Sequence, residues 1–128
     1  MSIDPTRFQL KRSAIEHKKT AQNSNTLSAK LLWFYSTECA LKSLYLKKNS
    51  LPIFTSRLAK NFGHNLSKLS KECAIPNNTR PVVALSGVNY PIHEFHERLR
   101  YGVNLPLNIE NSQLTYIKQV NSVVINLI

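Results

Sequence analysis

Apolar residues recur at helical spacing through most of this chain, and the densest stretch is residues 27–49, LSAKLLWFYSTECALKSLYLKKN. At about 100° per residue, apolar side chains fall on both sides of such a helix. One side carries Leu27, Leu31, Phe34, Leu41 and Tyr45, and the opposite side carries Trp33, Ala40 and Leu44. Because a surface helix of a small domain has one apolar stripe, this helix needs cover on two sides. We predict a central helix, covered by its own chain and by another.

The central helix is expected to follow an N-terminal helix over about residues 5–20. Asp4 is suited to cap that helix, Pro5 suits its first position, and Phe8, Leu10 and Ile15 are predicted to face inward. Asn23-Ser24-Asn25 should end it and cap the central helix, which should stop before Leu51-Pro52.

Three more helices are predicted in the second half of the chain. One opens at Gly63-His64-Asn65 and ends at Pro76-Asn77-Asn78, and another runs from Ile92 to Arg100. The last spans about Glu110 to Leu127. Their expected inward residues are Leu66, Leu69 and Cys73; Ile92, Phe95 and Leu99; and Leu114, Ile117, Val120, Val124 and Leu127.

Shorter segments are less regular. Residues 53–62 suggest a loop with a short helix anchored by Phe54, Leu58 and Phe62, and residues 81–85 suggest a short helix broken at Gly87. The β-branched run 120–125 is also compatible with a strand. Together these elements predict one domain over residues 1–128, all-α, an up-and-down antiparallel bundle of four to five helices.

Charge and composition narrow the functional classes. The net charge is +10; eleven Lys or Arg against three acidic residues lie in residues 1–62, and six against four in residues 63–128. Such an excess favours polyanions, including RNA, DNA and acidic proteins. Cys39 and Cys73 fall on apolar helix faces and are expected to be reduced. No secretory signal or membrane-spanning run is evident, so we expect a cytoplasmic protein without membrane association.

Three segments together resemble the HEPN family (higher eukaryotes and prokaryotes nucleotide-binding domain). Glu38-Cys39-Ala40-Leu41-Lys42-Ser43-Leu44 resembles the family's second-helix pattern of an acidic residue, small residues and then Leu-Lys-Ala/Ser-Leu. Gly63-His64-Asn65-Leu66 is similar to its His-Asp/Asn-Leu opening of the third helix. Arg100-Tyr101-Gly102 looks like its Arg-Tyr-Pro motif, with Gly in place of Pro. The three occur in the family's order and approximate spacing.

The resemblance implies a helical domain that often dimerises through its long helices. It also implies RNA binding, metal-independent RNA cleavage, nucleotide binding or an adaptor role. The usual setting is prokaryotic defence or a toxin–antitoxin pair, with a cognate partner such as a nucleotidyltransferase-type antitoxin. Ribonuclease members carry Arg, four to six residues and then His in a late helix; no His follows Arg98 or Arg100 here. Arg12…His17 and Arg57…His64 fit that spacing elsewhere.

Two groups of residues and a single histidine are candidates for the chemistry. Glu38 and Lys42 lie four apart on the central helix, where an ion pair is expected to serve either as a structural contact or as part of a phosphate-binding cleft. His64 opens a helix and is either a packing residue or an acid–base group. His93, His96, Glu97 and Arg100 lie on one side of their helix, as a solvated flank, a zinc-ligating set or a phosphate site. We predict His64, His96 and Arg100 as catalytic residues.

Basic residues elsewhere are candidates for contacting nucleic acid. They are Lys11, Arg12, Lys42, Lys47, Lys48 and Arg57, and the alternative for most of them is a solvated face. No cofactor or metal is expected. The predicted function is binding of RNA or a nucleotide by a HEPN-like homodimer. This prediction leaves undecided whether the protein also acts as a metal-independent ribonuclease or toxin. The alternative is a non-enzymatic adaptor that docks a partner protein.

Overall fold

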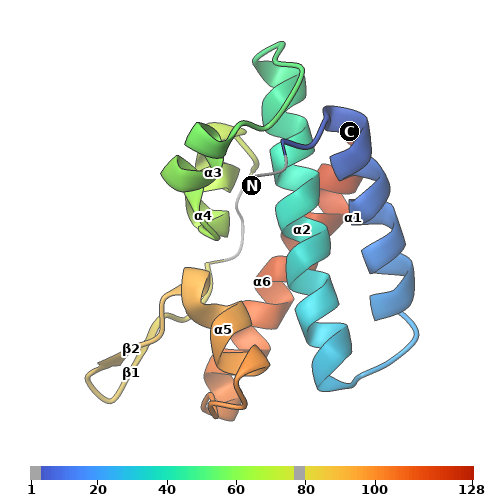
Figure 1. Cartoon of the computed structure of the whole chain (residues 1–128). Helices are drawn as coiled ribbons and strands as arrows, with labels where there is room; N and C mark the ends of the chain where they lie inside the picture. Colours follow the sequence, from blue (N-terminus) through green and yellow to red (C-terminus); the bar gives the residue numbers. More distant parts are fainter. Residues whose placement is uncertain (1–3, 77–79) are drawn as a thin grey trace.

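The computed structural model describes residues 4–76 and 80–128, and this part of the chain is mostly helical. It contains six α-helices, one 3-10 helix and one two-stranded antiparallel sheet (Figure 1). The elements are α1 (Arg7–Ala21), α2 (Leu27–Lys48), α3 (Ser56–Phe62), α4 (Leu66–Glu72), β1 (Ala84–Leu85), β2 (Val88–Asn89), η1 (Ile92–Glu94), α5 (Phe95–Arg100) and α6 (Leu107–Ile125). None of the described helices is long and apolar enough to span a membrane.

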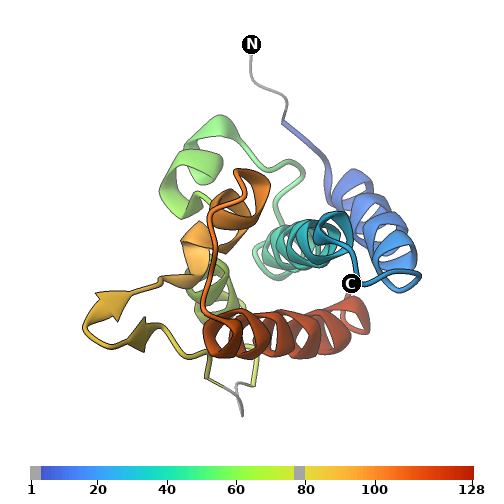
Figure 2. The ribbon, with the colours of Figure 1, turned by 90° about the horizontal axis from the view of Figure 1, so that it is seen from below.

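Helix α2 is central, as the apolar pattern predicts. Helix α1 packs along one side, α4 and α5 lie on the other, and α6 covers a third side (Figures 1 and 2). Small polar residues allow these close approaches. The Ser36 hydroxyl donates to the Ala14 carbonyl of α1 at 2.6 Å, and the Thr37 hydroxyl donates to the Ile117 carbonyl of α6 at 3.2 Å. The chain itself therefore covers most of α2.

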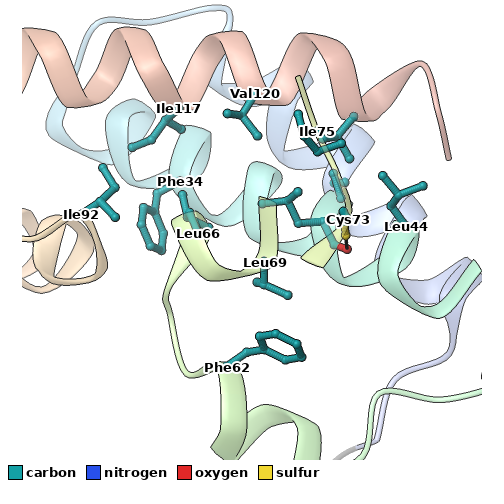
Figure 3. Close-up of a cluster of buried hydrophobic side chains, with 14 of the residues drawn as sticks. Phe34, Leu44, Phe62, Leu66, Leu69, Cys73, Ile75, Ile92, Ile117 and Val120 are labelled. Atoms are coloured by element: carbon teal, nitrogen blue, oxygen red, sulfur yellow. Dashed lines mark hydrogen bonds between the residues drawn. The ribbon is translucent and has the colours of Figure 1, made fainter. Parts of the chain in front are cut away.

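One hydrophobic core joins the long helices to the short ones. Figure 3 shows side chains of α2, α4 and α6 converging, with Phe34 beside Ile92 and Leu66. Phe54 and Phe62 are buried and Leu58 is half-buried, so the short helix predicted within residues 53–62 is confirmed with its anchors. Cys39 and Cys73 are both free thiols, as expected.

The start of α1 differs from the prediction. Thr6, and not Asp4, caps the helix: its side chain accepts from the Gln9 amide while the Gln9 side chain accepts from the Thr6 amide. The buried stripe of α1 is Leu10, Ala14 and Ala21. Phe8, predicted to face inward, is 67% exposed, because two residues on a helix separate it from Leu10 by about 200°.

The expected short helix at residues 81–85 is wrong. Residues 84–89 form a β-hairpin, with Leu85 paired to Val88. Ser86 and Gly87 both have positive φ, 52° and 80°, as a two-residue type I′ turn requires. Gly87 thus shapes a turn between strands. The hairpin projects from the helices (Figures 1 and 2) and is held at its base by Gln113 of α6, whose amide donates to the Val82 and Tyr90 carbonyls.

The remaining boundaries lie close to those predicted. Thr26 caps α2 in place of the Asn23–Asn25 segment, and α4 ends at Glu72, before Pro76; Asn77 and Asn78 lie outside the described residues. The helix expected from Ile92 begins as η1 and continues as α5, with Ile92, Phe95 and Leu99 buried. Residues 120–125 are helical, so the strand alternative is wrong. Leu127, expected inside, lies beyond α6 and is exposed.

Candidate functional site

A buried carboxylate at the middle of α2 organises the most unusual polar cluster of the molecule. Glu38 is only 5% exposed. Its Oε2 lies 2.8 Å from His64 Nδ1 and 3.7 Å from Lys42 Nζ, and its Oε1 lies 3.1 Å from His64 Nδ1. The Glu38–Lys42 pair expected from the i, i+4 spacing is therefore present. Because Lys42 also lies over the Phe54 ring and is largely buried, it serves to hold Glu38 rather than to reach a ligand.

The backbone between α3 and α4 places His64 against Glu38. Gly63 follows α3 with φ of 54°, and the Asn65 side chain accepts from the Lys68 amide to cap α4. His64 sits between these two caps, in the turn that the sequence predicts at the opening of this helix. Its side chain is 48% exposed. The hydrogen bond to Glu38 is the main cause that raises the pKa of His64, so the imidazolium form is favoured.

His96, on α5, lies directly behind His64. The two ring centroids are 4.2 Å apart, and the His96 ring stacks on Phe34 at 4.9 Å. His96 is 1% exposed, and its Nδ1 has no hydrogen-bond partner among the described residues. Burial, followed by the nearby charge of His64, lowers the pKa of His96. The inner imidazole is therefore held neutral beside an outer one that is readily protonated.

Arg100 lies at the end of α5, close enough that its charge contributes to lowering the pKa of His96. It is exposed. Its Nη2 donates to the Tyr101 hydroxyl at 3.0 Å, and its guanidinium lies 4.7 Å from the Tyr101 ring centroid. The accessible cations of this region are thus His64 and Arg100. We call Glu38, Lys42, His64, His96 and Arg100 the histidine cluster.

Among the described residues, the other basic candidates make no hydrogen bond or ion pair with the histidine cluster. Arg57 is exposed on α3 and shares a hollow with Lys60, while Lys11 and Arg12 lie on α1. Lys47 Nζ donates to the Leu127 carbonyl, and Lys48 Nζ donates to the Cys73 carbonyl. The structure therefore separates the predicted basic residues into several surfaces.

The described residues hold no group of three or more His, Cys, Asp and Glu side chains arranged to bind a metal ion. His93 is exposed on η1, whereas His96 of the same predicted set is buried. Burial is the main cause that raises the pKa of both Cys39 and Cys73 to about 11, which keeps them as unreactive thiols at neutral pH.

Neither the burial of His96 nor the identity of the rings that flank it was predicted from the sequence. A signal was present: Ile92, Phe95, His96 and Leu99 follow the i, i+3, i+4, i+7 spacing of a helix face, which places His96 within the apolar stripe. Nothing local, however, indicates that Phe34 of α2 and His64 would flank it.

Comparisons with known proteins give no match: no family model matches the chain, no curated protein matches it, and no solved structure matches it.

Proposed function

We propose that the chain is an RNA- or nucleotide-binding domain of HEPN type that binds a phosphate group at His64 and Arg100. The observation that carries this proposal is the meeting of Glu38, His64 and His96, which come from α2, the α3–α4 turn and α5. Two of the three segments that resemble the HEPN family, those of Glu38 and His64, thus meet directly, and the third begins at Arg100 at the end of α5, the helix that carries His96. An imidazolium and a guanidinium that are both accessible suit a phosphodiester.

Each residue of the histidine cluster has a distinct role in this proposal. Glu38 and Lys42 are positioning residues, since the first holds the His64 ring and the second holds Glu38. His96 is a positioning residue too, because its burial prevents contact with a ligand and its ring backs that of His64. His64 and Arg100 are the groups that touch the phosphate.

The same arrangement suits metal-independent RNA cleavage. When a ribose 2′-OH attacks the adjacent phosphate, its proton passes to water, negative charge develops on the phosphate oxygens, and the bond to the 5′ oxygen breaks as that oxygen accepts a proton. Arg100 would stabilise that charge, and His64 in its imidazolium form would donate the proton. The raised pKa of His64 favours the protonated form that this role requires.

The binding test compares the unmodified protein with His64→Gln, and with His93→Gln as a control at an exposed histidine. We expect His64→Gln to weaken RNA binding by roughly ten-fold, the loss of one charge-assisted hydrogen bond. Binding to the unmodified protein should also weaken as the pH rises through the raised pKa of His64, because the proton is then lost. His93→Gln should bind normally. No RNA binding even at low salt would refute the proposal.

Cleavage is tested by incubating the protein with RNA in the presence of a chelator. Cleavage that persists in chelator and disappears in His64→Gln and Arg100→Gln would support the assigned roles. Equal cleavage by His64→Gln and the unmodified protein would exclude His64 as the catalytic residue while leaving a binding role open to the first test.

We also propose a homodimer, in a defence or toxin–antitoxin setting. The N-terminal half of α2 supports it: Leu27 is exposed, and Leu31, Leu32 and Trp33 are only half-buried by the chain itself. Sedimentation at several concentrations checks the dimer. A monomer at every concentration, or a dimer unchanged by Leu27→Ser with Leu31→Ser, would contradict this interface.

An adaptor role is the second candidate, favoured by one observation. The hairpin and the α5–α6 connection expose large apolar side chains: Val82, Val83, Leu85 and Val88 on the first, and Tyr101, Val103 and Leu107 on or beside the second. Exposed apolar side chains gathered on a projecting element are typical of a protein-docking surface. A salt titration of RNA affinity separates the two functions, since a steep dependence supports RNA binding and an absence of binding supports the adaptor.

A further inference from the structure

Phe8 is the starting observation for a second site. It lies in the first turn of α1, a helix whose inner stripe of Leu10 and Ala14 is buried against α2. The Phe8 ring is on the outer side, 67% exposed. Among the described residues, Phe8 is not part of the hydrophobic core, and apart from the half-buried Ile15 the outer side of α1 is polar.

The surroundings of the ring are hollowed and basic. One hollow of about 270 Å³ is lined by Phe8, Lys11, Arg12, Ile15 and Glu16. A second, of about 570 Å³, shares Phe8 and is lined also by Thr6, Arg7, Leu46, Lys47, Ser50, Leu51 and Pro52. Phe8 is thus the wall between two adjoining hollows, and the Arg7 guanidinium lies 4.6 Å from its ring centroid.

Acidic side chains neutralise little of the positive charge of this surface. Glu16 lies in it, 3.9 Å from Lys19. Lys11 and Arg12 make no ion pair with any described residue, and Lys47 donates only to the Leu127 carbonyl. Cations therefore flank the aromatic ring on both sides: Arg7 and Lys47 in one hollow, and Lys11 and Arg12 in the other.

We propose that this surface, named here the Phe8 surface, binds single-stranded nucleic acid. A base stacks on the Phe8 ring, and the phosphates on either side of it contact Arg7 and Lys47 in one direction and Lys11 and Arg12 in the other. Aromatic stacking combined with a basic track is the usual means of binding a single strand without sequence preference.

An anionic membrane is the other polyanion that a basic helix can bind, and the structure favours it less. Membrane-surface helices present a broad apolar face to the lipid. The apolar face of α1 is already packed against α2, which leaves Phe8 and the half-buried Ile15 on the outside. One ring in a basic surface suits a stacked base better than an acyl layer.

The Phe8 surface is distinct from the histidine cluster. Helix α1 lies on one side of α2, and α5 lies on the other (Figure 2). The inference shares the ligand class of the proposed function but does not require cleavage at His64. In a protein that has both sites, the Phe8 surface would hold a nucleic-acid strand while the histidine cluster acts on one of its phosphates.

The test measures binding of a fluorescent single-stranded oligodeoxythymidine, which lacks the 2′-OH and cannot be cut by 2′-OH attack. Phe8→Ala should weaken binding about 5-fold or more, the effect of losing one stacked base, while Phe8→Tyr should stay within about 2-fold. Leu107→Ala, at an equally exposed apolar residue of α6, is the matched control and should bind normally. The double variant Lys11→Gln with Arg12→Gln should make the dependence of log affinity on log salt less steep, reducing the magnitude of its slope by about 1.4.

Several results would overturn the inference. Phe8→Ala that binds the oligonucleotide normally would do so, as would equal losses in Phe8→Ala and Leu107→Ala. Vesicles containing anionic lipid form a further arm: vesicle binding that depends on Phe8, with oligonucleotide binding that does not, would assign the surface to membranes. The oligonucleotide affinities of Phe8→Ala and Phe8→Tyr test the Phe8 surface, whereas RNA cleavage by His64→Gln tests the histidine cluster, so failure of one site is distinguishable from failure of the other.

Discussion

Glu38 is the residue on which the histidine cluster depends. Its carboxylate is nearly inaccessible, and two cationic side chains, His64 and Lys42, lie within 4 Å of it. A buried carboxylate is unfavourable without such partners, so removing any one of the three affects the other two. The physical consequence that is easiest to observe is the protonation of His64.

Glu38→Gln should lower the pKa of His64 toward its ordinary value of 6.5, because the amide keeps the shape but not the charge. In the unmodified protein the raised pKa contributes stability that is fully present below pH 6.5 and is lost as the pH rises through the raised value. The destabilisation caused by Glu38→Gln should therefore be larger at about pH 6 than at about pH 9. NMR titration of the imidazole and urea unfolding at both pH values measure the two effects.

His96 provides a control, because its pKa is shifted in the opposite direction to that of His64. Its lowered pKa contributes stability that is present above pH 6.5 and is lost as the pH falls through the lowered value. His96→Phe, which keeps the stacking on Phe34 and removes the unpartnered Nδ1, should reduce the acid sensitivity of folding. Equal acid sensitivity in Glu38→Gln, His96→Phe and the unmodified protein would mean that the cluster does not control these protons.

At the scale of the elements, buried hydroxyls hold α1, α2 and α6 together. The Asn121 amide of α6 donates to the Ser36 hydroxyl at 2.8 Å and the Thr37 hydroxyl at 3.2 Å, both on α2. Ser36 in turn donates to the Ala14 carbonyl of α1. This network links the three long helices through one amide, and it fixes their relative positions more specifically than apolar contacts alone.

Asn121→Ala should therefore destabilise the protein by about 1–3 kcal/mol, since the two hydroxyls lose a buried donor. Asn126→Ala is the matched control, because the Asn126 amide makes an exposed hydrogen bond to the Ser122 carbonyl within the same helix end. The change in the midpoint of urea unfolding gives both values. Equal, small effects of the two substitutions would show that the network does not contribute to stability.

At the scale of the whole molecule, the dominant property is a net charge of +10 on 128 residues. Like charges on a small body repel one another, and they are most crowded along α1 and the end of α2, where Lys11, Arg12, Lys18, Lys19, Lys47 and Lys48 lie. Repulsion among these charges is therefore expected to destabilise the folded protein, and screening by salt or a bound polyanion should reduce that repulsion.

Raising sodium chloride from about 20 mM to about 200 mM should increase the melting temperature, because the Debye length shortens and repulsion falls. A single-stranded oligonucleotide at low salt should increase it further, as any ligand of the folded state does. Differential scanning calorimetry measures both shifts. A melting temperature that falls with salt would indicate that the ion pairs of the protein outweigh its repulsion.

Features that depend on residues close together in the chain are predictable from the sequence, whereas features that depend on distant residues are not. Helices α2, α4 and α6 and the Glu38–Lys42 pair are predictable because each depends on residues three or four positions apart in one helix. The resemblance to HEPN proteins and the roles of the site residues stay predictions. The sequence also indicated reduced cysteines and a strong positive charge.

The periodicity of the long helices and the charge that they carry can thus be established from the order of the amino acids alone. The tertiary structure decided which face of each helix is covered, and so placed Phe8 outside and His96 inside. It also decided that Gly87 turns a hairpin, and that His64 of the α3–α4 turn meets His96 of α5. The reason is physical: a local pattern orients side chains around their own helix axis, but burial, proximity and protonation depend on neighbours that are distant in the chain.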